Sequence, residues 1–273
     1  MSDSDLEDPE YEEESILLHG TQSSYQFSVM TIVPPPLEYM AKLHSNQQEV
    51  SGRQVWSGSA VLCLYLMGNQ SSIFGRDTGK ILELGCGTGI VGMLAHHLHQ
   101  SNNMRILSDY KTAICLTDGD DTALDLLQKN LTSPINQISS KICKGTKLLW
   151  GQIYSDEFET WCKTEWPDIW SQSESISFDI ILAGDVLYKS MLPPLFFSTV
   201  LNYLSPGGSL FLCHIPRNHV EQSMVQKAAR QAGLNIEILK SPDLSSLPEC
   251  CPLYDAERAA LYKISRARFI QED

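Results

Sequence analysis

The sequence lacks the features that mark membrane-spanning, secreted and metal-binding chains. No uncharged apolar run approaches the ~20 residues that a helix needs to cross a bilayer. The N-terminus, Met1-Ser2-Asp3-Ser4-Asp5, is acidic and has neither the basic nor the apolar region of a signal peptide. The eight cysteines form no C-x-x-C pair, and no His/Cys cluster indicates a metal. We expect a protein of the cytoplasm or also the nucleus, with mostly buried cysteines and no membrane partner.

Positive charge is missing from the N-terminal end. Residues 1–14 carry eight acidic residues and no Lys or Arg, which leaves 25 acidic against 20 basic residues in the rest of the chain. We expect residues 1–20 to form an acidic disordered tail and residues 21–273 to form a single domain with an N-terminal strand and helix extension. The mildly acidic body argues against direct nucleic-acid binding and is compatible with a basic protein substrate. A tail that only aids solubility is an equal alternative.

Internal repeats are absent, and strands alternate with helices over most of the 273 residues. Such alternation predicts right-handed βαβ units and a mostly parallel sheet, with ligands bound beyond the carboxyl ends of the strands. The expected strands are 25–33, 80–84, 113–117, 145–149, 178–183, 209–214, 234–239 and 259–265. The expected helices are 58–67, 90–98, 122–131, 195–204 and 220–232.

The turn after the strand at 80–84 is rich in glycine. Gly85, Gly87 and Gly89 let the backbone approach a ligand, and the following helix points its free N–H groups at the same place. Gly87-x-Gly89-x-x-Gly92 also satisfies the dinucleotide fingerprint, and an ordinary flexible turn is a third interpretation. Glu83 just before the turn favours S-adenosyl-L-methionine, which has no diphosphate for a carboxylate to repel.

Two further strand ends carry residues suited to a nucleoside. Asp118 follows the strand at 113–117, where its carboxylate accepts both ribose hydroxyls or caps the next helix, a task that Asp120 can also perform. Trp150 follows the strand at 145–149, where an indole stacks on adenine or simply joins the core.

The strand at 178–183 ends in Ala183-Gly184-Asp185-Val186-Leu187-Tyr188. Asp185 and Tyr188 are our candidates for holding the nucleophile; in the alternative, Asp185 caps the next helix and Tyr188 packs. The preceding segment, residues 154–177, contains three tryptophans. We expect this segment to cover the sheet, and substrate selection by exposed aromatic residues is the alternative.

Taken in order, these strand ends resemble the seven-β-strand S-adenosylmethionine-dependent methyltransferases. The similarity is greatest to the protein-lysine branch, the METTL21-like group of methyltransferase family 16, and covers residues 50 to 266. It rests on the following motifs: Val55-Trp56, Glu83-Leu-Gly85-Cys-Gly87-Thr-Gly89, Leu116-Thr-Asp118, Leu149-Trp150-Gly151 and Asp185-Val-Leu-Tyr188. The last motif is the D-x-x-Y signature of that branch.

The resemblance implies an α/β, Rossmann-like fold with a seven-stranded, mostly parallel sheet, helices on both faces and an antiparallel last strand. It implies a monomer that methylates a lysine amine of a non-histone protein. The implied cofactor-binding residues are Trp56, Glu83, Gly85, Gly87, Gly89, Asp118, Trp150 and Ala183. Asp185 and Tyr188 would be catalytic, with Asp185 capturing the amine and Tyr188 aligning it.

Other functions remain open on the sequence. A histidine or arginine acceptor, a small-molecule acceptor, an NAD-dependent oxidoreductase and a non-enzymatic interaction module are the alternatives. Glu83 and the lack of an evident hydride-transfer pair argue against the oxidoreductase. His96, His97 and His99 lie near an expected helix end, where we expect them to be solvated.

Overall fold

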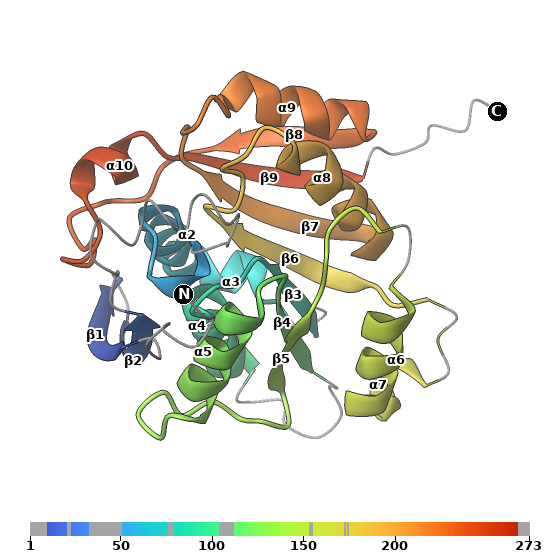
Figure 1. Cartoon of the computed structure of the whole chain (residues 1–273), viewed down its shortest axis with the longest axis horizontal. Helices are drawn as coiled ribbons and strands as arrows, with labels where there is room; N and C mark the ends of the chain where they lie inside the picture. Colours follow the sequence, from blue (N-terminus) through green and yellow to red (C-terminus); the bar gives the residue numbers. More distant parts are fainter. Residues whose placement is uncertain are drawn as a thin grey trace, which may run out of the picture.

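A central sheet dominates the structure, a computed structural model (Figure 1). It describes residues 10–20, 23–32, 51–75, 79–103, 112–152, 155–171, 173 and 175–266. The first half of the predicted tail, residues 1–9, lies outside the described residues, as do parts of the 154–177 segment. None of the helices in the described ranges is long and apolar enough to cross a bilayer.

The sheet has seven strands in the order β5-β4-β3-β6-β7-β9-β8. Their bounds are β3 Lys80–Leu84, β4 Ala113–Asp118, β5 Cys143–Lys147, β6 Phe178–Gly184, β7 Leu204–His214, β8 Leu234–Leu239 and β9 Ala260–Arg266. Strands β3 to β7 pair in parallel, whereas β9 is antiparallel to both of its neighbours, β7 and β8. The predicted α/β, Rossmann-like sheet with an antiparallel last strand is therefore confirmed.

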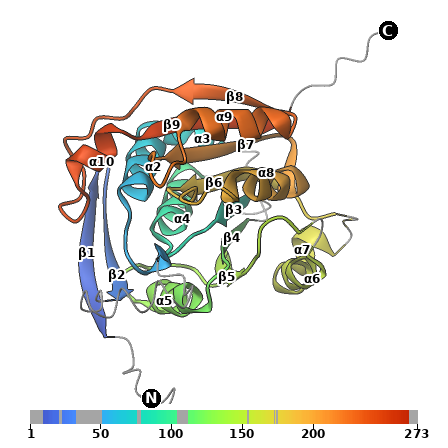
Figure 2. The same cartoon turned by 45° about the horizontal axis from the view of Figure 1, so that its top comes forward.

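Helices cover both faces of the sheet, which explains the nearly continuous apolar runs of β3 and β6. One hydrophobic cluster lies under α2 Ser57–Gly68, α3 Gln70–Ile73, α4 Ile90–Asn103, α5 Asp121–Thr132 and α10 Leu253–Glu257. The other lies under α6 Asp156–Glu165, α7 Pro167–Trp170, α8 Leu192–Tyr203 and α9 Gln222–Gln231. Figure 2 shows these layers from a second direction.

A two-stranded hairpin, β1 Tyr11–His19 and β2 Ser24–Ile32, packs beside α4 and α5 (Figure 2). The prediction of a strand near residues 25–33 is confirmed. The prediction of a disordered tail over residues 1–20 is wrong over Tyr11–His19. Ile16 and Leu18 alternate with exposed neighbours and bury their side chains, so the strand contributes to the core despite its acidic composition.

Two buried asparagines join this hairpin to the region around α5. The Asn136 side chain accepts the Ser28 N–H at 2.8 Å and donates to the Ser28 carbonyl at 2.7 Å. The Asn130 side chain accepts the Met30 N–H at 2.6 Å and donates to the Thr88 carbonyl at 2.9 Å. The two side-chain amides therefore pair with backbone groups of β2 in the way that a further strand would. Asn130 also links β2 to the glycine turn.

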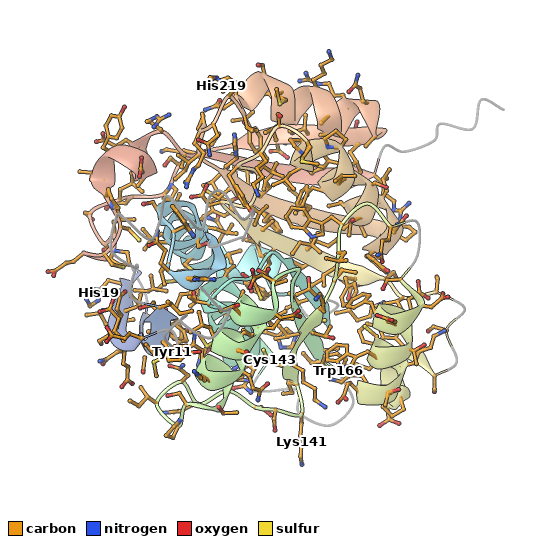
Figure 3. The ribbon with its side chains drawn as sticks, viewed as in Figure 1. Tyr11, His19, Lys141, Cys143, Trp166 and His219 are labelled. Atoms are coloured by element: carbon orange, nitrogen blue, oxygen red, sulfur yellow. The ribbon has the colours of Figure 1, made fainter. Side chains whose placement is uncertain are left out.

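The segment of α6 and α7 covers the edge of the sheet, as the sequence analysis expected. Trp166 and Trp170 are buried and meet edge to face at 5.7 Å, while Trp161 is half-buried. The Trp166 indole, labelled in Figure 3, donates to the Lys141 carbonyl at 3.0 Å. These tryptophans therefore pack in the core that covers the sheet and do not form an exposed aromatic cluster that could select a substrate.

Several boundaries differ from the prediction. Helix α8 begins at Leu192 instead of 195, because Pro193 occupies the first turn, where a missing N–H is tolerated. Strand β5 covers Cys143–Lys147, two residues earlier than predicted. Burial of most cysteines is confirmed: all eight are free and only Cys250 is exposed.

Solvation of the α4 histidines is wrong. His96 and His99 are buried, and His97 packs against the rings of Tyr25 and Phe27. The His96 Nε2 atom accepts the Ser139 N–H at 3.2 Å, and burial lowers the pKa of His96 to about 4. The helix extends further than predicted and the hairpin covers it, so these side chains face protein.

Candidate active site

The carboxyl ends of β3, β4 and β6 and the loop after β5 meet at one edge of the sheet. Gly85, Gly87 and Gly89 have φ angles of 70°, 51° and 84°. A Cβ atom at Gly85 would lie 2.8 Å from Val186 Cγ1 and 3.2 Å from Trp150 Cζ2. The turn therefore requires glycine both for its left-handed backbone and for the close approach of the β5 and β6 loops.

Glu83 lies behind this turn and is only 2% exposed. Its Oε2 atom accepts the Gly92 N–H at 2.9 Å, so the carboxyl group holds the first turn of α4. Burial raises the pKa of Glu83 to about 8. The role predicted for Glu83 in cofactor binding stays a prediction; what the structure shows is support of the glycine turn.

The raised pKa of Glu83 makes stability depend on pH. A group whose pKa is higher in the folded protein stabilises it fully below the unfolded pKa, 4.5 here, and this contribution is lost as pH rises towards 8. At ~1.4 kcal/mol per pKa unit, this loss amounts to several kcal/mol of unfolding free energy. We expect Glu83→Gln to remove the loss, because glutamine does not ionise and its side-chain oxygen still accepts the Gly92 N–H. Urea unfolding at pH 5 and pH 8 measures the difference.

Exposed Glu157, in the first turn of α6, provides the matched control. Glu157→Gln should leave the difference in unfolding free energy between pH 5 and pH 8 as it is in the wild type. If Glu83→Gln also leaves that difference unchanged, ionisation of Glu83 does not destabilise the fold.

Asp118 ends β4 and faces the glycine turn. Its Oδ2 atom accepts the Gly87 N–H at 2.9 Å, and its Oδ1 atom accepts the Asp120 N–H at 3.0 Å. Burial raises the pKa of Asp118 above its usual value. The cap of α5 is Asp120, which accepts the Ala123 N–H at 3.1 Å, so the helix-cap alternative for Asp118 is excluded.

The two tryptophans of the predicted site lie on either side of the β6 exit. Trp150 is half-buried, approaches Gly85 and packs edge to face on Phe196 at 5.1 Å. Trp56 precedes α2, and its ring lies 4.8 Å from the Arg217 guanidinium carbon. Ala183 is fully buried near the end of β6.

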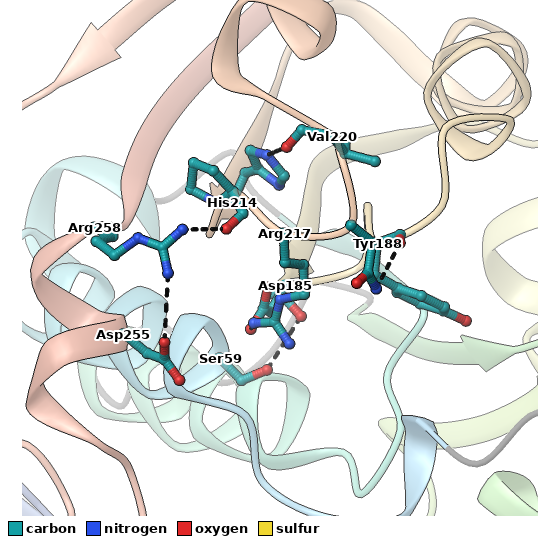
Figure 4. A network of polar contacts seen from close by, with 11 residues as sticks. Ser59, Asp185, Tyr188, His214, Arg217, Val220, Asp255 and Arg258 are labelled. Carbon is teal, nitrogen blue, oxygen red and sulfur yellow. Dashed lines mark hydrogen bonds and ion pairs between the residues drawn. The ribbon is translucent and has the colours of Figure 1, made fainter. Parts of the chain in front are cut away.

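Asp185 has a φ of 62°, a left-handed backbone that aspartate adopts at a cost of ~1–2 kcal/mol. Its carboxylate accepts the N–H groups of Gly58 and Ile215 and forms an ion pair with Arg217 (Figure 4). Burial raises the pKa of Asp185 to about 6, against the opposing effect of Arg217. The cap position of α8 is Met191, so the helix-cap alternative for Asp185 is also excluded.

Tyr188 lies three residues after Asp185, in the loop that follows β6. Its carbonyl accepts the Asn218 side-chain N–H at 3.3 Å, and its ring lies 5.4 Å from Lys189 Nζ. Figure 4 shows the phenol directed away from the Asp185 carboxylate. The predicted convergence of these two side chains on one ligand stays a prediction.

The segment that covers the glycine turn was not predicted from the sequence. Gly52 of the 3-10 helix Ser51–Arg53 lies against Gly87 and Asp118; its Cβ position is 3.6 Å from Gly87 Cα. The Nε atom of Arg53 is buried and has no hydrogen-bond partner among the described residues. An unsatisfied cationic donor beside a glycine cradle fits a ligand with a carboxylate and a nucleoside, as S-adenosylmethionine has.

Arg217 was not predicted from the sequence either, since only its position three residues beyond the strand predicted at 209–214 could have indicated it. Within the described ranges, no three His, Cys, Asp or Glu side chains group in a way that could hold a metal ion.

Comparison with known proteins gives relatives of one activity. The chain is 26% identical over 178 residues to the protein N-lysine methyltransferase METTL21A of Danio rerio, covering 64% of this chain and 66% of that protein. It is 24% identical over 225 residues to the protein-lysine N-methyltransferase EFM6 of Saccharomyces cerevisiae, covering 79% and 81%. The chain thus spans just under two thirds of the zebrafish relative.

Two solved methyltransferase structures have a partly similar course of the chain. The apo structure of the S-adenosylmethionine-dependent methyltransferase SibL has a TM-score of 0.48 and 13% identity, covering 86% of this chain and 60% of that one. Magnesium protoporphyrin IX methyltransferase of Synechocystis has a TM-score of 0.45 and 10% identity, covering 85% and 92%. The family model described as lysine methyltransferase matches residues 38–231, most of the chain. The protein therefore belongs to the lysine methyltransferase family.

Proposed function

We propose that this protein methylates the side-chain amine of a lysine in a non-histone protein. The observation that carries the proposal is the meeting of Gly85, Asp118, Trp150 and Asp185 at one edge of a sheet in a chain of this family. A glycine cradle, a carboxylate and an indole are the groups that a nucleoside bearing an amino acid requires.

The cofactor-binding residues have separate tasks in this proposal. Gly85, Gly87 and Gly89 line the methionyl part, and Arg53 pairs with its carboxylate. The Asp118 carboxylate accepts the N–H groups of Gly87, Gly119 and Asp120, which leaves one of its about four acceptor positions for a ribose hydroxyl. The remaining predicted residues complete the site: Trp56, Glu83, Trp150 and Ala183.

The chemistry requires a neutral lysine. A free lysine has a pKa of about 10.4, so only roughly one in a thousand is unprotonated at neutral pH. The bound cofactor supplies an electrophilic methyl group on a positively charged sulfur. The chain's own task is to exclude water and to align the amine, which supplies several kcal/mol of the barrier reduction. Tyr188, at the mouth of the site, is the candidate for alignment.

The charge of the chain supports a basic protein as the partner. Glu12 and Glu13 of β1 are exposed, and the whole chain carries a net charge of −13, which favours a basic protein surface over nucleic acid as the partner. A monomer in the cytoplasm and nucleus is consistent with this composition.

Methyl transfer into a cell lysate tests the proposal. Lysate from cells that lack this protein is incubated with the purified chain and tritiated S-adenosylmethionine, and the labelled band is digested for mass spectrometry. We expect methyl-lysine in a discrete protein band. Label confined to lipids or metabolites would refute a protein substrate, and methyl-histidine or methyl-arginine would refute the lysine assignment.

A further inference from the structure

Arg217 fills the space between two residues of the predicted site. Its guanidinium pairs with Asp185 Oδ2, and its central carbon lies 4.8 Å from the centre of the Trp56 ring. The Asp185 side chain is 2% exposed, against 23% for Arg217, so the guanidinium lies on the solvent side of the buried carboxylate. A cation on an aromatic face beside a carboxylate is the contact set that would otherwise receive a lysine ammonium group.

The loop after β7 holds Arg217 in place. The Val220 N–H donates to the Arg217 carbonyl at 2.8 Å, across Asn218 and His219 with φ angles of 49° and 64°. On the other side, Arg258 Nη2 donates to the Pro216 carbonyl at 2.6 Å (Figure 4). Backbone contacts on both sides of Arg217 oppose its withdrawal from the carboxylate.

Asp185 has little capacity left for a further partner. A carboxylate offers about four acceptor positions. The N–H groups of Gly58 and Ile215 and the Arg217 guanidinium already use three of them. Moreover, Gly58 packs so closely on Asp185 that a Cβ atom there would lie 2.6 Å from Asp185 Cβ. The carboxylate therefore joins the start of α2 to the exit of β7.

We propose that Arg217 is a positioning residue: with Asp185 it forms an electrically neutral unit that fixes Trp56 and offers no net negative charge to the target amine. This inference rests on the proposed function, and it replaces ammonium capture by Asp185. A neutral pair does not raise the pKa of the lysine, whereas an isolated carboxylate would hold the amine in its unreactive ammonium form.

The test compares the wild type with three variants: Arg217→Met, Asp185→Asn and the double variant. Asparagine tolerates the left-handed backbone and still accepts the Gly58 N–H. The first measurement is the initial rate of tritium transfer from S-adenosylmethionine into lysate protein between pH 6 and pH 9. The second is the free energy of unfolding in urea over the same pH range, which needs no methyl transfer.

Arg217→Met should reduce the rate at pH 7 at least ~10-fold, because a buried charge is left unpaired. Its pH–rate profile should move ~1 unit upward, since the lone carboxylate raises the pKa of the amine. The double variant should return to within ~3-fold of the wild type, with the original profile. Arg230→Met, which removes an exposed guanidinium of α9, should match the wild type throughout.

Stability gives the independent result. Loss of Arg217 removes the group that opposes the raised pKa of Asp185, so the variant should lose stability more steeply as pH rises through neutrality. The double variant should lack this dependence. A double variant that stays ~10-fold or more slower than the wild type would show that Asp185 acts on the amine directly, which overturns the proposal. An Arg217→Met variant that unfolds with the wild-type pH dependence would also overturn the proposal. This result does not depend on whether the substrate is a lysine.

Discussion

We expect Gly87→Arg to abolish cofactor binding, measured as an affinity for S-adenosylhomocysteine that is at least ~100-fold weaker than that of the wild type. Gly87 has a φ of 51°, which costs other residues ~1–2 kcal/mol. A Cβ atom there would lie 3.3 Å from the Gly52 carbonyl, so a long side chain must displace Ser51–Arg53 or enter the space of the ligand. The Gly87 N–H that orients Asp118 would move as well. Isothermal titration of the purified protein with S-adenosylhomocysteine measures the loss.

Gly207→Arg is the control for backbone strain. Gly207 also has a left-handed φ, 84°, but a Cβ atom at this position meets nothing within 4 Å. Arginine at position 207 should therefore reduce stability slightly and leave the affinity unchanged. Binding by the Gly87→Arg protein within a few-fold of the wild type would place the cofactor elsewhere.

Asn136→Ala has the second large effect that we expect, a loss of about 2–4 kcal/mol in the free energy of unfolding. The side chain satisfies the Ser28 N–H at 2.8 Å, the Ser28 carbonyl at 2.7 Å and the Asn130 carbonyl at 2.8 Å. Each polar group left unpaired in a buried site costs about 1–3 kcal/mol, less where water can enter. Urea unfolding gives the total, and hydrogen exchange of β2 amides shows where it arises.

Asn102→Ala is the matched control, because within the described part of the chain the Asn102 side chain donates only to the Leu98 carbonyl of its own helix, α4. It should change stability by less than about 0.5 kcal/mol. Unchanged protection of the Ser28 amide in Asn136→Ala would mean that the hairpin is held by its apolar contacts alone, with no need for the asparagines.

The sheet could be predicted from the sequence because its signals are local. Seven of the eight expected strands begin and end within two residues of those observed, since apolar runs bounded by glycine and proline mark them. The glycine turn could be predicted as well, because positive φ angles such as those of Gly85, Gly87 and Gly89 favour glycine at the position itself.

The contacts that the sequence could not predict join distant residues. Asp185 and Arg217 are 32 positions apart, and Asn136 contacts a residue 108 positions away. An isolated arginine or asparagine has no periodicity, so only the folded chain shows what it meets. The acidic strand Tyr11–His19 was missed for a related reason: net charge concealed the alternation of Ile16 and Leu18.

Strand β9 is the last strand in chain order, yet it lies inside the sheet and pairs with β7 on one side and β8 on the other. During synthesis, β7 therefore presents an open edge until residues 260–266 have emerged from the ribosome, and β8 has no partner. Exposed edges invite pairing with other chains, so this interval is the period of greatest risk of aggregation. The half of the sheet that carries the glycine turn contains no such late strand and can be complete before translation ends.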